Sequence, residues 1–159
     1  MTNQKFFSVG KLGKPHSLKG YQYINIEYFF RNFDLKETTF QIEGKDIVVE
    51  DFKKHLKNRN LIKFYSYDSI EKISELRNKT VKINTEVSDL FINEENLPWP
   101  GFFIGHELKK NMYNLLSYEV LNNIYFCKIT GIEMNVPYNS NFFNFENGVL
   151  SLLDSSLTI

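Results

Sequence analysis

The N-terminal half of the chain contains the segment Gly10-Lys11-Leu12-Gly13-Lys14-Pro15-His16-Ser17-Leu18-Lys19-Gly20. Its glycines and proline predict a backbone that reverses direction, or that approaches a neighbouring segment where a side chain would be in the way. Strand-forming residues flank the segment, at 6–9 before it and at 21–26 after it. The segment therefore predicts a turn between two β-strands, with Gly10, Gly13 and Gly20 as its structural residues.

Further short runs of β-branched and aromatic residues predict strands along the rest of the chain. They lie at Lys5–Lys11, Tyr21–Tyr28, Thr39–Ile42, Asp46–Phe52, Leu61–Phe64 and Thr80–Ile83, and then at His106–Lys109, Ser117–Leu121, Ile124–Thr130, Met134–Tyr138 and Val149–Leu153. One helix is predicted, with Asp68 as its N-cap and Glu71 three residues on, as in a capping box. We therefore expect an all-β protein with one short helix, whose first half forms a small closed barrel of six strands.

Residues 86–101 predict a linker between two domains. This segment contains Leu97-Pro98-Trp99-Pro100-Gly101, and its prolines disfavour both helix and sheet pairing. The expected domains are residues 1–85 and residues 102–159. Trp99 is expected to pack against one of them and so limit their relative motion.

The net charge of zero hides an asymmetry between the two halves. Residues 1–85 hold 16 Lys and Arg against 10 Asp and Glu, whereas residues 86–159 hold 3 against 9. Opposite charges predict different partners, nucleic acid for the first half and a basic protein for the second. The alternative is that the two halves attract each other within one molecule.

Several classes of protein are disfavoured by the sequence. No apolar run approaches the roughly 20 residues that span a bilayer, and the N-terminus lacks the pattern of a secretory signal. The single Cys127 cannot form an internal disulfide, which fits the cytoplasm, and its place in a strand predicts that it is buried. The three histidines lack metal-ligand spacing, and phosphate-loop, nucleophile-elbow and dinucleotide motifs are absent. We therefore expect no enzyme, no cofactor, no metal and no membrane partner.

The glycine-rich segment is also strongly basic. Lys11, Lys14, His16 and Lys19 lie within nine residues, and such a cluster can meet several RNA phosphates at once. These residues are therefore predicted to bind RNA or the ribosome. Two alternatives remain: the lysines are simply solvated, and the His16 ring donates to a backbone carbonyl and holds the loop.

The spacing of this segment resembles the N-terminal signature of the RimM family, bacterial ribosome maturation factors. The matching residues are Gly10, Gly13, His16, Leu18, Lys19 and Gly20. The resemblance continues through Leu61–Phe64, Ile73–Lys79, Leu97-Pro98, the aromatic pair before Ile104-Gly105, and Asn135–Tyr138, in the family's order.

The resemblance implies an N-terminal barrel like those of translation factors, followed by a PRC-type barrel. It implies a cytoplasmic, monomeric, non-catalytic ribosome assembly factor. Such a factor binds the head of the immature 30S small subunit, contacts ribosomal protein S19 through its C-terminal region, and supports 16S rRNA processing. The alternatives are a general RNA-binding β-barrel and a PRC-barrel scaffold for protein interactions.

The sequence departs from the family pattern at three places. Ser17 stands where the family prefers glycine, so the turn is strained if this position needs a positive φ. Asn78 also replaces a glycine, a milder change because asparagine tolerates the left-handed conformation. Phe102 and Phe103 replace a tyrosine pair, and we expect them to bind the ribosomal protein. The alternative is that both phenylalanines pack under the linker with Trp99.

Overall fold

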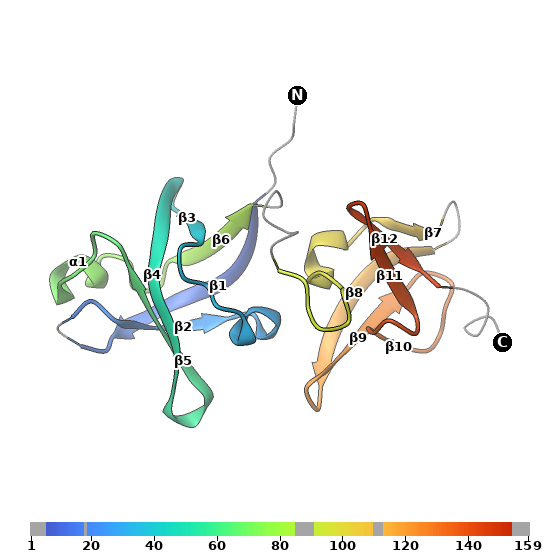
Figure 1. Ribbon diagram of the computed structural model, residues 1–159, viewed down its shortest axis with the longest axis horizontal. Coiled ribbons are helices and arrows are strands. Elements are labelled where there is room, and N and C mark those ends of the chain that lie inside the picture. Colours follow the sequence, from blue (N-terminus) through green and yellow to red (C-terminus); the bar gives the residue numbers. More distant parts are fainter. Residues whose placement is uncertain (1–5, 18, 85–90, 110–112, 154–159) are drawn as a thin grey trace. The chain divides into compact units, whose positions relative to one another are not determined.

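The computed structural model describes residues 6–17, 19–84, 91–109 and 113–153 (Figure 1). The chain divides into two compact units, Met1–Val87 and Ser88–Ile159. Helical segments in the described ranges are short: α1 (Ile70–Ser74) and the 3₁₀ helices η1 (Tyr28–Asn32), η2 (Leu56–Asn58) and η4 (Pro100–Phe103). None of the helices in these ranges is long and apolar enough to cross a membrane. The prediction of a mainly β protein with one short α-helix is confirmed.

The first unit is a closed barrel, with its strands in the order β1-β2-β5-β4-β3-β6 (Figure 1). The strands are β1 (Phe6–Pro15), β2 (Gln22–Ile26), β3 (Thr39–Ile42), β4 (Lys45–His55), β5 (Arg59–Phe64) and β6 (Thr80–Asn84). Alternation places apolar side chains inside: Ile24 and Ile26 are buried, whereas Asn25 between them is exposed. The predicted six-stranded barrel is confirmed.

Strand β1 is longer than predicted. It continues to Pro15, so Gly10 and Gly13 lie inside a strand and not in the turn. A Cβ at Gly10 would lie 2.9 Å from the backbone oxygen of Asn25 on β2. This glycine therefore permits a close approach of two strands, which the glycine pattern alone could not distinguish from a turn. Gly20 is in the turn, with a φ of 97°.

Helix α1 begins one residue later than predicted. Ser69 is the N-cap in place of Asp68, and its Oγ accepts a hydrogen bond from the backbone N–H of Lys72 at 3.3 Å. Ser and Asp have similar N-cap preferences, so only the backbone conformation decides between neighbours. Ser69 has the extended φ of −136° that an N-cap requires.

The two departures in the first unit have different outcomes. Asn78 has a φ of 68°, as expected for a residue that replaces glycine, and its N–H donates to the oxygen of Leu12 at 2.8 Å. Ser17 is not among the described residues with a positive φ. The strain that a glycine position predicts therefore does not arise at Ser17.

The second unit contains a four-stranded sheet and a two-stranded sheet. The first has the order β10-β9-β8-β7 and consists of β7 (Glu107–Lys109), β8 (Tyr113–Leu121), β9 (Ile124–Ile129) and β10 (Val136–Pro137). The second pairs β11 (Phe143–Glu146) with β12 (Val149–Leu152). Strand β11 was not predicted, because its two phenylalanines alternate with polar residues over only four positions.

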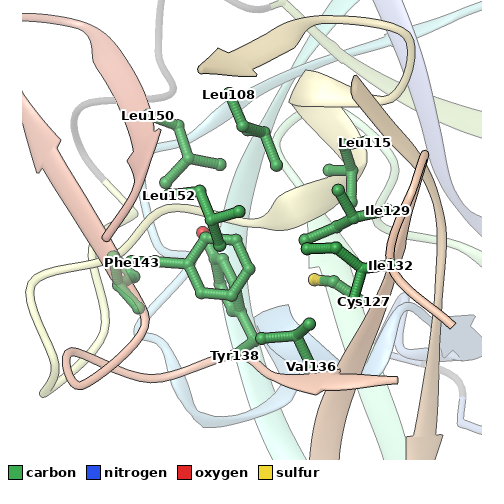
Figure 2. Close-up of a cluster of buried hydrophobic side chains, with 11 residues drawn as sticks. Leu108, Leu115, Cys127, Ile129, Ile132, Val136, Tyr138, Phe143, Leu150 and Leu152 are labelled. Carbon is green, nitrogen blue, oxygen red and sulfur yellow. The ribbon is translucent and has the colours of Figure 1, made fainter. Parts of the chain in front are cut away.

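Apolar side chains from the two sheets meet in one core (Figure 2). Phe143 and Leu152 of the small sheet point toward Leu115 and Ile129 of the large sheet. Cys127 lies in the same cluster and is fully buried, as predicted. Burial raises the pKa of its thiol to about 12, which keeps it neutral and unreactive.

Most of the predicted linker belongs to the second unit. Residues 86–90 lie outside the described residues, but Leu97 is buried in the core. The Tyr138 hydroxyl donates to the Pro98 oxygen at 2.6 Å, and the Trp99 indole N–H donates to the Tyr118 hydroxyl at 3.1 Å. Pro98 pairs with Ile92 in an isolated antiparallel bridge and Pro100 begins η4, so the expectation that the prolines disfavour helix and sheet pairing is only partly met.

Candidate nucleic-acid interface

A groove of about 580 Å³ lies on the first unit, where β1, β2 and the start of β5 meet. Its cationic side chains are Lys11, Lys14, Arg31 and Arg59. Its polar side chains include the amides of Asn25, Asn58, Asn60 and Asn78. None of its lining residues carries a carboxylate. This basic groove therefore attracts anions without an internal carboxylate that would repel them.

The strand register explains why these residues meet. Lys11 on β1 faces Asn25 on β2, and Tyr23 on β2 faces Leu61 on β5. Arg59 follows directly on the turn between β4 and β5, a hairpin that projects from the barrel in Figure 1. Barrel closure thus brings together cations that are far apart in sequence.

Aromatic rings cluster at one end of the basic groove. The Arg59 guanidinium lies over the Tyr23 ring, 5.1 Å from its centroid, and the Lys14 ammonium lies 6.0 Å from it. The rings of His16 and His55 meet Tyr23 edge-on, at centroid distances of 5.2 and 5.9 Å. The ring centroids of His16 and His55 are 4.6 Å apart. Among the described residues, no group of three or more side chains is arranged to bind a metal ion.

The four predicted RNA-binding residues do not all lie in the basic groove. Lys11 and Lys14 line the basic groove, whereas Lys19 does not and is exposed on the turn. His16 contacts the ring cluster, and its Nδ1 shares a hydrogen bond of 3.1 Å with the Tyr23 hydroxyl. The ring thus holds a side chain of β2, and not a backbone carbonyl as in the alternative.

Sequence reasoning missed Tyr23, Arg31 and Arg59. Tyr23 was interpreted only as a strand residue, although its alternation with buried Ile24 places it on the outer face. Arg59 belongs to a polar run that predicts a hairpin turn, which gives no sign of a partner. Arg31 is fixed by a hydrogen bond from its Nε to the oxygen of Ile26 at 3.1 Å.

The predicted pair Phe102 and Phe103 lies in the second unit. Phe102 is buried, and its ring meets Trp99 edge-on at 5.0 Å. Phe103 is half-buried and contacts His106 and Phe145 at centroid distances of 5.5 and 5.9 Å. Phe102 is therefore a core residue, and only Phe103 keeps a surface that a partner could contact.

Beside the basic groove, Tyr21 donates a hydrogen bond to Asp51, and the Lys53 ammonium lies 4.3 Å from the Tyr21 ring centroid. The hydrogen bond to Asp51 raises the pKa of Tyr21 from 10.0 to about 12, and that from Tyr21 lowers the pKa of Asp51. The backbone N–H of His16 donates to the Tyr21 oxygen at 2.8 Å. This pair thus lies where the turn between β1 and β2 closes.

We expect Tyr21→Phe to lower the free energy of unfolding by about 1 kcal/mol at pH 7, because one charge-assisted hydrogen bond is lost. A raised tyrosine pKa contributes stability below pH 10 that is lost as pH rises toward 12. The difference between the variant and the unaltered protein should therefore shrink from pH 10 to 12. Urea unfolding followed by circular dichroism measures this difference in unfolding free energy, and Tyr67→Phe is the control.

The sequence of residues 7–88 matches the family model described as the RimM N-terminal domain. No curated protein matches the chain. Among solved structures, the N-terminal domain of RimM from Thermus thermophilus is 16% identical, with 52% of this chain and 92% of that chain covered and a TM-score of 0.44.

A second structure is that of a Pseudomonas aeruginosa protein assigned as a 16S ribosomal RNA processing protein, RimM. It is 10% identical, with 96% of this chain and 99% of that chain covered and a TM-score of 0.42. The family match itself spans just over half of the 159 residues, and it includes every strand of the closed barrel apart from Phe6, the first residue of β1. The chain therefore belongs to the RimM family.

Proposed function

We propose that the protein is an assembly factor of the small ribosomal subunit. It binds the immature 30S head, with the first unit on 16S rRNA and the second on ribosomal protein S19, and it supports 16S rRNA processing. It acts in the cytoplasm, as a monomer, without catalysis or a cofactor. Membership of the RimM family supports the ribosomal role. The observation that carries the RNA contact is the basic groove, with four cations and no carboxylate among its lining residues.

Binding alone is sufficient for this function. An immature RNA head samples several conformations, and a factor that binds one of them more tightly increases its population. Mature contacts that compete for the same surfaces then release the factor. The acidic second half, with 9 Asp and Glu against 3 Lys and Arg in residues 86–159, favours encounter with a basic ribosomal protein.

Sedimentation of the tagged protein with ribosomal fractions of bacterial cells tests this function. We expect enrichment with free small subunits and absence from complete ribosomes. Equal binding to all RNA-containing fractions would instead indicate a general RNA-binding barrel. Absence from every ribosomal fraction, with protein partners retained, would indicate a protein-interaction scaffold.

Phe103→Ala tests the contact of the second unit. We expect the variant to lose at least tenfold in binding to purified S19, because aromatic side chains are enriched at interfaces and a few residues carry most of the binding energy. Phe126→Ala, which also removes a half-buried phenylalanine from this unit, is the matched control. Trp99 fluorescence verifies that both variants stay folded. Unchanged binding by Phe103→Ala would contradict this contact.

A further inference from the structure

Arg59 lines the basic groove and places its guanidinium beside an aromatic ring. Its guanidinium lies 5.1 Å from the Tyr23 ring centroid, and the side chain is exposed. A guanidinium plane stacks on an aromatic ring with one face and keeps the other for a second planar group. RNA-binding proteins place unpaired bases on such planes.

Tyr23, the ring beside this guanidinium, is held in place by its neighbours. Its hydroxyl is hydrogen-bonded to His16, and its ring makes T-shaped contacts with the rings of His16 and His55. His55 faces Arg59 across the hairpin from β4 to β5, so the guanidinium, the tyrosine and both histidines belong to one cluster. A preorganised cluster of side chains loses little conformational entropy when a ligand binds.

The remaining surface of the groove fits the edges and phosphates of single nucleotides. Asn25, Asn58 and Asn78 present exposed amides, which offer both donors and acceptors to a base edge. The volume of about 580 Å³ falls in the range of about 300–1,000 Å³ typical of small-molecule sites. A paired helix keeps its bases stacked inside and cannot insert one into such a groove.

We propose that the basic groove binds single-stranded RNA, with one base stacked on the outer face of the Arg59 guanidinium. Lys11, Lys14 and Arg31 contact the phosphates on either side. Tyr23 is a positioning residue, which fixes the guanidinium plane. This inference rests on the proposed function in one respect, because it assumes that the first unit meets RNA.

The experiment separates stacking from charge. The full chain is titrated into a fluorescein-labelled RNA of about twelve nucleotides, either single-stranded or annealed to its complement, over a range of salt concentrations. We expect at least tenfold tighter binding to the single strand. Arg59→Lys keeps the charge and removes the planar group. It should weaken binding to the single strand about tenfold, the size of one lost base stack, and leave the salt dependence unchanged.

Arg77→Lys is the matched control, since Arg77 is exposed on the same unit and does not line the groove. Tyr23→Leu should resemble Arg59→Lys, because the guanidinium then loses the ring that fixes its plane. Equal affinity for duplex and single strand, or full binding by Arg59→Lys, would overturn the stacking proposal while RNA binding stands. Absence of RNA binding by the unaltered protein would overturn both this proposal and the RNA contact of the proposed function.

Discussion

The double variant Lys11→Gln/Lys14→Gln is expected to bind single-stranded RNA about 25-fold more weakly than the unaltered protein at 0.1 M salt. Each phosphate contact on a single strand contributes about 0.7 to the slope of the logarithm of affinity against the logarithm of salt concentration. Loss of both contacts should therefore reduce the slope by about 1.4. The two affinities are taken to be equal at 1 M salt. Over the one decade down to 0.1 M, a slope difference of about 1.4 then makes the affinity of the variant about 25-fold lower.

The control for this prediction is Lys45→Gln/Lys82→Gln. Both lysines are exposed on the same barrel, and neither lines the basic groove. The two double variants have the same net charge, so a difference between them reports position and not overall charge. Equal losses in both variants would mean that the field of the whole barrel, and not the groove, attracts RNA. Lys19→Gln alone should have little effect, because Lys19 lies outside the groove.

Phe143→Ala is expected to lower the free energy of unfolding of the second unit by about 3–5 kcal/mol. The Phe143 side chain is fully buried between the two sheets, and its ring lies 4.9 Å from that of Tyr138. Its removal leaves a cavity that the surrounding strands cannot close. A loss of this size is a large part of the stability of a small domain.

Urea unfolding measures this loss in each unit separately. Trp99 is the only tryptophan of the chain and is buried in the second unit, so its fluorescence follows that unit alone. Far-ultraviolet circular dichroism follows both units. We expect the transition of Trp99 to move to lower urea while the transition of the first unit keeps its midpoint.

Val149→Ala is the control, since Val149 is on the same hairpin and its side chain is 59% exposed. It should leave both transitions in place. A shift of both transitions in Phe143→Ala would contradict independent folding of the two units. They would then have to be treated as one cooperative domain.

Closure of the barrel positions the side chains that line the basic groove. A closed barrel has no free strand edges, so it offers partners its outer side chains rather than strand pairing. Close approach of β1 to β2 at Gly10 keeps the Lys11 side chain beside Asn25. Gly10 therefore contributes to the basic groove indirectly, by bringing two strands together.

Local sequence patterns were sufficient to predict the strands of the first unit, the burial of Cys127 and a basic segment, two of whose lysines line the groove. These features depend on local patterns: alternation along a strand and glycine spacing are set by residues within a few positions. Whether Gly10 marks a turn or a close approach of strands remained open, because both require the same absent side chain.

The grouping of the cations depends on the fold and not on local sequence. Arg31 and Arg59 lie 20 and 48 residues after Lys11 along the chain, and no local pattern relates them. Closure of the barrel brings them to one groove and leaves Lys19 outside it. The sequence also left Phe102 open, with binding to the ribosomal protein and packing against Trp99 as alternatives. Its contact with Trp99 and its burial depend on how the second unit folds over the segment before it.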